Sequence, residues 1–125
     1  MTAAKYLDLD SILLIIGRLG VGPVRDAGLL ASALGRPGVT LFGDGAYPTM
    51  PLKAAALLQS IAGNHALVDG NKRLAWTAAV VFLDINDLEP ALSQDEVYDL
   101  MLEVAAGLSD VEVIAERLRV VPRRC

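Results

Sequence analysis

Apolar residues recur at helical spacing along most of the chain. Between positions 8 and 19 isoleucines and leucines fall three or four residues apart, which predicts a first helix with Asp8 as its N-cap. A second, shorter helix is expected over positions 26–34, with Asp26 as its cap. Glycine and proline follow both segments and end them.

The middle of the chain predicts two helices that are apolar on nearly all sides. The first is expected from Thr49, a candidate N-cap followed by a proline, to about Gly63. The second is expected from about Asn71 to Asn86. Helices of this kind belong at the centre of a domain, and their many alanines allow a close approach. The loop between them is therefore predicted to lie against the core.

The C-terminal part contains two Ser-x-x-Glu patterns, which begin at Ser93 and Ser109. Each predicts a capping box that opens a helix. The first of these helices is expected to reach Ala106 and the second about Val120. The remaining residues, from about 121 to 125, are expected to form a flexible tail.

These elements predict an all-α fold, a compact single-domain bundle of about six helices over residues 1–125. Residues 39–47 are the least regular stretch: 39–42 have strand character, and the turn-rich Gly43-Asp44-Gly45 follows. With 125 residues and a hydrophobic fraction of 54%, the chain is long enough for one core but not for two.

Charge and composition exclude several classes of function. The net charge of −4 argues against a nucleic-acid-binding surface, which needs a basic face. The N-terminus lacks a signal-peptide core, and the longest apolar run, at positions 74–83, is too short to span a bilayer. Cys125 is the one cysteine, so no internal disulfide can form and a reducing cytoplasm fits. A cytoplasmic protein without direct nucleic-acid or membrane contact is expected.

One stretch, positions 65–73, carries most of the candidate chemistry. It reads His-Ala-Leu-Val-Asp-Gly-Asn-Lys-Arg and leads directly into the second central helix. A helix N-terminus presents free N–H groups and the positive end of the dipole, both of which favour phosphate. His65, the one histidine, is the side-chain type that serves as a general base near neutral pH.

The other residues of this stretch suit a polyphosphate ligand. Gly70 permits positive φ and a close approach to a ligand, and Asn71 can cap the helix and still offer an amide. Lys72 is a mobile point charge, whereas Arg73 is a bidentate fork for phosphate oxygens. Asp69 is a hard oxygen ligand of the kind that binds Mg²⁺.

Each residue also has a simpler interpretation. A lone histidine is often a half-buried structural residue, and Asp69 could only cap the helix. Lys72 and Arg73 could be the solvated start of a helix, although cations there oppose the dipole unless an anion is bound. Trp76 could be core or could border a bound nucleotide. The combination of residues in one place favours the functional interpretation.

The stretch resembles the signature loop of the Fic/Doc family, His-x-x-x-Asp-Gly-Asn-x-Arg. The lysine at position 72 resembles the Doc (death-on-curing) toxin branch. The likeness extends over most of the chain, through segments 25–34, 47–49, 53–55 and 64–65. In this family the segment equivalent to 39–47 is a flap over the active site that positions the target chain. We expect either that function here or a plain surface loop.

Three departures from the family pattern bear on the chemistry. Leu67 replaces the usual phenylalanine, which changes a core anchor. Trp76 stands where Fic adenylyltransferases carry a second arginine, and Lys72 stands where they carry glycine. Both of these changes remove parts of the pocket that seats the nucleotide for AMP transfer.

The resemblance therefore implies a Doc-like protein kinase that transfers the terminal phosphate of ATP to a Ser/Thr hydroxyl. His65 and Asp69 would be catalytic, with Asp69 also holding Mg²⁺, and Gly70, Asn71, Lys72 and Arg73 would bind phosphates. Such a protein is the toxin of a bacterial toxin–antitoxin pair that modifies elongation factor Tu and halts translation.

Control by a cognate antitoxin, as a peptide helix in an apolar groove, is expected. Some Fic proteins instead inhibit themselves with a helix in which glutamate precedes Gly or Asn, and no glutamate here does so. A Fic-type AMP transferase and a catalytically silent nucleotide- or anion-binding module are the alternatives.

Overall fold

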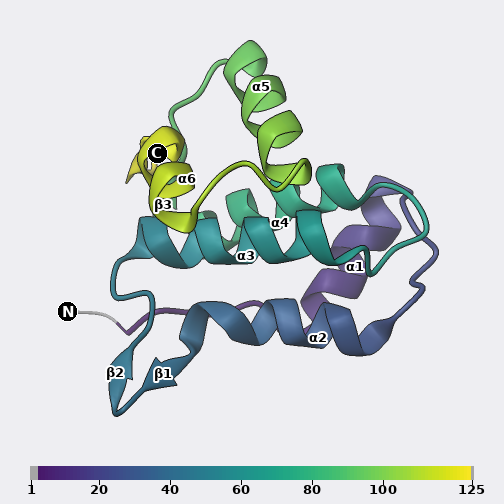
Figure 1. Cartoon of the computed structure of the whole chain (residues 1–125), viewed down its shortest axis with the longest axis horizontal. Coiled ribbons are helices and arrows are strands. Elements are labelled where there is room, and N and C mark those ends of the chain that lie inside the picture. The colour runs from purple at the N-terminus through teal and green to yellow at the C-terminus, as the bar shows by residue number, and fades with distance from the viewer. Residues whose placement is uncertain (1–2, 125) are drawn as a thin grey trace.

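Two central helices, α3 (Met50–Asn64) and α4 (Asn71–Ile85), form the most extensive contact between elements in the molecule (Figure 1). The computed structural model describes residues 3–124. Both helices bury most of their apolar residues, and the alanines among these are at most 1% exposed. This close packing of small residues confirms the two buried helices that the sequence predicts.

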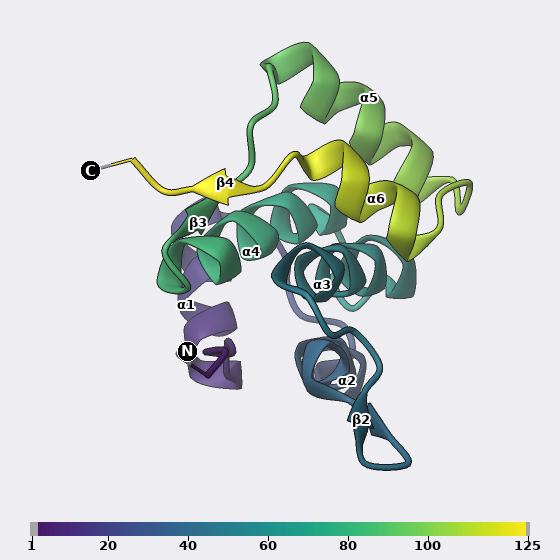
Figure 2. The same cartoon turned by 90° about the vertical axis from the view of Figure 1, so that its left-hand side faces the viewer.

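The other four α-helices of the described chain cover the central pair on two sides. α1 (Leu9–Leu19) and α2 (Ala27–Gly35) pack on one side, and α5 (Gln94–Ala105) and α6 (Val111–Leu118) pack on the other. Figures 1 and 2 show the resulting three layers, with α3 and α4 in the middle. The all-α bundle of six helices is confirmed.

Four of the predicted helix starts have the expected side-chain caps. Asp8, Asp26 and Thr49 each accept a hydrogen bond from the backbone N–H three residues ahead, and Ser93 forms a full capping box. The second predicted box is wrong. α6 begins after Asp110, with no side-chain cap, and Ser109 is buried with its carbonyl accepting a hydrogen bond from Gln59.

Ser109 is held by this tertiary contact, and the helix that follows ends at Leu118, two residues earlier than expected. Among residues 3–124, no helix combines the length and apolarity needed to cross a bilayer.

The irregular stretch forms a short hairpin. A 3-10 turn, Arg36–Gly38, leads into β1 (Thr40–Leu41), which pairs with β2 (Asp44–Gly45). The turn lies at Phe42 and Gly43, which both have positive φ, so the residues Asp44-Gly45 predicted as turn belong to the second strand.

The hairpin does not cover the loop between α3 and α4. It precedes the N-terminal end of α3, whereas the loop follows the C-terminal end (Figure 1). A helix of 15 residues separates the two by about 22 Å. The sequence left two alternatives for this segment, a flap over the active site and a plain surface loop, and the position of the hairpin favours the surface loop.

The C-terminal segment also differs from the prediction. β4 (Val121–Pro122) pairs with β3 (Leu88–Glu89), just after the end of α4. The Arg123 guanidinium donates hydrogen bonds to the carbonyl oxygen of Asp84 and to the carboxylates of Asp84 and Asp87. The predicted flexible tail is thus attached to the body at residues 121–123, and Cys125 lies outside the described residues.

Candidate functional site

The signature stretch forms a short loop, residues 65–70, which reverses the chain between α3 and α4 (Figure 1). Both ends of the loop use left-handed backbone. His65 is the C-cap of α3 with φ 55°, and Gly70 is the N-cap of α4 with φ 91°. The loop is therefore a defined structure in which the backbone of His65 adopts a conformation that non-glycine residues seldom use.

A neighbouring segment, residues 22–26, holds the loop from outside. It lies antiparallel to the loop, with an isolated bridge between Val24 and Leu67. Its backbone exchanges hydrogen bonds with loop residues on both sides of that bridge: Gly22 N–H to Asp69 C=O, Val68 N–H to Pro23 C=O, and Arg25 N–H to Ala66 C=O, at 3.0, 3.0 and 2.7 Å. These bonds fix the path of the loop backbone.

The Arg25 side chain adds a direct contact with the candidate general base. Its Nε donates to the carbonyl oxygen of His65 at 3.1 Å, and its Nη2 donates to the same atom. These two donors fix the backbone carbonyl of His65 and so the peptide group between His65 and Ala66. Arg25 is therefore suited to position His65 through its carbonyl.

Asn71 has a different local role from the one predicted. Gly70, not Asn71, is the N-cap of α4, and Asn71 is the first helical residue. The Asn71 side chain accepts a hydrogen bond from Leu67 N–H and donates one to Leu67 C=O, both at 3.0 Å. Leu67 is buried at 2% exposure, so the amide closes the loop around an apolar anchor.

The loop and the start of α4 enclose a pocket of about 380 Å³. All six residues singled out from the sequence line it, together with three apolar neighbours: His65, Asp69, Gly70, Asn71, Lys72 and Arg73, with Ala62, Val68 and Ala105. The structure thus gathers the predicted residues around one hollow. Their catalytic and binding roles remain predictions.

The pocket has a positive end. Lys72 and Arg73 are exposed in the first turn of α4, which contains no acidic residue and no side-chain cap. Within residues 3–124 neither cation forms an ion pair. Free N–H groups at a helix N-terminus and two uncompensated cations both attract an anion, above all a phosphate.

The residues fit a metal that arrives with a nucleotide better than a resident ion. No group of three or more His, Cys, Asp or Glu residues in the described chain could hold a metal. Asp69 is the one carboxylate that lines the pocket. Mg²⁺ bound to substrate phosphates needs only one or two protein carboxylates, because phosphate oxygens and water complete its shell.

The sequence did not reveal the support behind the loop. Val21 lies against Gly70, and Arg25 holds His65, yet both precede the loop by 40 residues or more along the chain. Arg25 was noted only within the family likeness. The glycine and proline at positions 22 and 23 marked a break between helices, and nothing local indicated that this break pairs with the loop.

Comparison with known proteins identifies the family of the chain. Residues 2–83 match the family model described as the Fic/DOC family. A curated protein of Mycolicibacterium smegmatis named Toxin Doc is 50% identical to the chain over 119 aligned residues, and the match covers 91% of each protein. The family model covers the loop, its supporting segment, all of α3 and most of α4, and the chain therefore belongs to the Fic/DOC family.

Proposed function

We propose that this protein is the toxin of a bacterial toxin–antitoxin pair and acts as a protein kinase, transferring the terminal phosphate of ATP to a Ser/Thr hydroxyl. The observation that carries the proposal is the pocket itself. It combines a histidine, a carboxylate and two cations that form no ion pair within residues 3–124, at a helix N-terminus without a side-chain cap. The relative named Toxin Doc supports the toxin role.

The transfer step would need little covalent chemistry from the protein. The target hydroxyl oxygen forms a bond to the γ-phosphorus, the bond from that phosphorus to the β–γ bridging oxygen breaks, and ADP leaves. The His65 imidazole accepts the hydroxyl proton. Arg25 keeps the His65 carbonyl in place during this step, and positioning of this kind accounts for much of enzymatic phosphoryl transfer.

The remaining residues would bind and stabilise the phosphates. Lys72 and Arg73 supply charge, and the N–H groups after Gly70 supply donors aimed at an anion. Asn71 uses its oxygen on Leu67, and its amide nitrogen keeps a second hydrogen for a phosphate oxygen. Asp69 would hold Mg²⁺, which neutralises the charge that develops on the phosphate oxygens.

Two features favour transfer of the terminal phosphate over AMP transfer. Lys72 stands where Fic adenylyltransferases carry glycine, and Trp76 stands where they carry a second arginine. Trp76 lines a groove beside the loop pocket and contributes no charge there.

The proposed target is elongation factor Tu, and the proposed inhibitor is a cognate antitoxin that lays a helix in an apolar groove. Production of the chain alone should then arrest bacterial growth, and co-production of the antitoxin should restore it. Harmless production at high level would contradict the toxin role.

The decisive assay uses purified elongation factor Tu, Mg²⁺ and ATP labelled at either the α or the γ phosphate. The kinase proposal expects label on the protein target from γ-labelled ATP only. Label from α-labelled ATP would make the protein an AMP transferase. Binding of ATP with no transfer to any protein of a bacterial extract would indicate a silent nucleotide-binding module.

A further inference from the structure

Asn64 is the last residue of α3, and its side chain bonds the backbone of the loop just beyond His65. The carboxamide oxygen accepts a hydrogen bond from the N–H of Ala66 at 3.2 Å. The resulting turn closes around His65, and turns of this kind are characteristic of asparagine. Ala66 is buried at 1% exposure, so its N–H depends on a partner within the protein. The Asn64 side chain supplies that partner.

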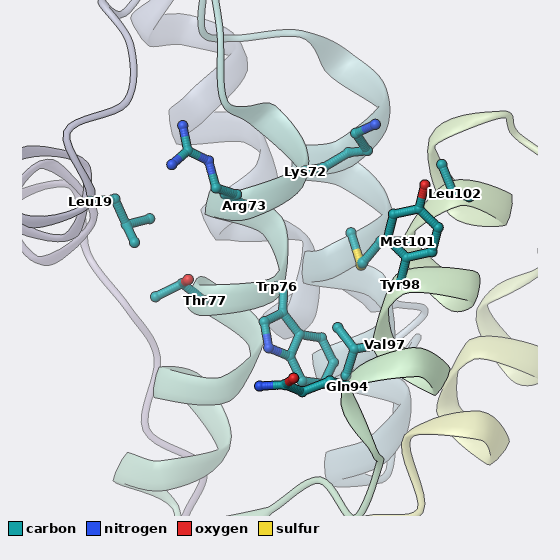
Figure 3. Close-up of a pocket in the computed structure, with 10 residues that line it drawn as sticks. All are labelled: Leu19, Lys72, Arg73, Trp76, Thr77, Gln94, Val97, Tyr98, Met101 and Leu102. Atoms are coloured by element: carbon teal, nitrogen blue, oxygen red, sulfur yellow. The ribbon is translucent and has the colours of Figure 1, made fainter.

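We propose that Asn64 is a positioning residue, which orients the His65 imidazole for proton transfer by fixing the backbone that carries it. The inference rests on the proposed function, since it assumes that His65 acts as the base. Asn64 does not line the loop pocket, nor the groove between α4 and α5 in which Figure 3 shows Lys72 and Arg73 at one end. It therefore acts through His65 and does not bind the nucleotide.

The peptide group between His65 and Ala66 is held at both of its polar ends. Arg25 Nε donates to its oxygen at 3.1 Å, and the Asn64 oxygen accepts from its N–H. The next carbonyl, that of Ala66, accepts hydrogen bonds from the backbone N–H groups of Arg25 and Asp26 at 2.7 and 3.1 Å. The rotation of the peptide group, which changes ψ of His65 and φ of Ala66, is therefore restricted from two directions.

His65 needs this support because of its own backbone conformation. It has φ 55° and ψ 45°, the left-handed conformation, at a helix C-terminus where glycine is the usual residue. A residue with a side chain keeps this conformation only where its surroundings enforce it. Relaxation of φ and ψ would turn the imidazole relative to Asp69 and the rest of the loop pocket. Loss of the Asn64 hydrogen bond would permit that relaxation.

The same carboxamide connects the loop to α2. Its nitrogen donates to the carbonyl oxygen of Leu29, in α2, at 2.9 Å. The two partners also fix the orientation of the amide, because a backbone N–H only donates and a carbonyl oxygen only accepts. Asn64 is thus held by a neighbouring helix while it holds the loop, so its oxygen has a defined position from which to support His65.

Single-turnover transfer from γ-labelled ATP to elongation factor Tu and NMR of the imidazole test the inference together. His65 is the one histidine of the chain, so its imidazole gives unambiguous signals in the untagged protein. Asn64→Ala should lower the transfer rate about 10- to 100-fold with unchanged affinity for ATP, because the base is misplaced. The imidazole signals should shift and broaden. Asn64→Ser, which keeps a weaker side-chain acceptor for the Ala66 N–H, should recover part of the rate.

Asn86→Ala is the matched control. Asn86 is the C-cap of α4, at the end of that helix away from the loop, and it is half-buried, as Asn64 is. Its carboxamide forms three hydrogen bonds with the backbone of Lys5 and Phe82, against two for Asn64. Asn86→Ala should therefore lower the melting temperature at least as much as Asn64→Ala, but it should leave the transfer rate and the imidazole signals unchanged.

A wild-type transfer rate and unshifted imidazole signals in Asn64→Ala would overturn the positioning role and leave the proposed function intact. An equal loss of rate in Asn86→Ala would also overturn it, since lower stability would then explain the effect. If the wild type transfers no phosphate to elongation factor Tu or to any protein of a bacterial extract, the proposed function fails. The imidazole signals would still decide whether Asn64 holds His65.

Discussion

The side chain of Val21 lies directly against the α-carbon of Gly70. A Cβ on Gly70 would come within 2.4 Å of Val21 Cγ1 and 2.5 Å of its Cβ. Gly70 also has φ 91°, a conformation that side chains disfavour. The glycine of the signature loop is therefore required twice, by its own backbone and by the segment that supports the loop.

Gly70→Ala should consequently lower the free energy of unfolding by at least about 2 kcal/mol and abolish phosphate transfer. Denaturant unfolding and the transfer assay measure the two effects. Gly63→Ala is the matched control, because Gly63 lies inside α3 at negative φ with nothing within 4 Å of an added Cβ. That substitution should be neutral or stabilising by up to about 1 kcal/mol. A fully stable and active Gly70→Ala protein would contradict the loop geometry.

Arg25→Ala should lower the rate constant of transfer about 10- to 100-fold with little change in the KM for ATP, because the residue positions His65 and does not contact the nucleotide. Arg25→Lys, which keeps a single donor, should give an intermediate rate. Steady-state kinetics separates kcat from KM. Arg18→Ala removes another exposed arginine that forms no ion pair in the described chain, and it should have no effect. A rise in KM alone would mean that Arg25 binds substrate directly.

Asn71→Ala should destabilise the protein by about 1–3 kcal/mol, because the N–H and C=O of the buried Leu67 would both lose their partner. Asn71→Asp keeps the acceptor but sets a carboxylate against the Leu67 carbonyl, so it should recover little. Thermal unfolding measures both variants. Lys72→Gln, at the adjacent exposed position, should change stability by less than about 0.5 kcal/mol. Equal stability of all three variants would show that the loop does not need the amide.

Ser93→Ala and Ser109→Ala should differ, although both serines begin the same Ser-x-x-Glu pattern. Ser93 caps α5, and its loss should cost about 1 kcal/mol. α6 has no side-chain cap, so Ser109→Ala should cost less than about 0.5 kcal/mol. Denaturant unfolding of the two variants side by side is the measurement. A larger loss of stability in Ser109→Ala would contradict the structure and indicate that the Ser109 side chain caps α6.

The predictions that held rest on contacts close in sequence. Asp8, Asp26, Thr49 and Ser93 each accept a hydrogen bond from the backbone N–H three residues ahead. Both partners of each bond therefore lie within one short sequence pattern. The candidate site was visible for the same reason, since its six residues occupy positions 65–73 and line one pocket.

The predictions that failed depend on contacts between distant segments. The Ser109 carbonyl accepts a hydrogen bond from Gln59, 50 positions away, and Asp110 takes the N-cap position of α6. The support of the loop by residues 22–26 and the pairing of Val121–Pro122 with Leu88–Glu89 likewise join remote parts of the chain. The hairpin forms within the predicted positions 39–47. Its separation from the loop by the length of α3 could not be read from the sequence.

The central claim, that His65 is the base in a phosphate transfer at this loop, is tested most directly by His65→Ala in a single-turnover assay with saturating γ-labelled ATP, alongside a titration of ATP binding. His65 is exposed in the loop, so the substitution should leave the fold intact. We expect unchanged ATP affinity and a transfer rate lowered about 10²- to 10⁴-fold. Transfer at the wild-type rate in His65→Ala would contradict the mechanism.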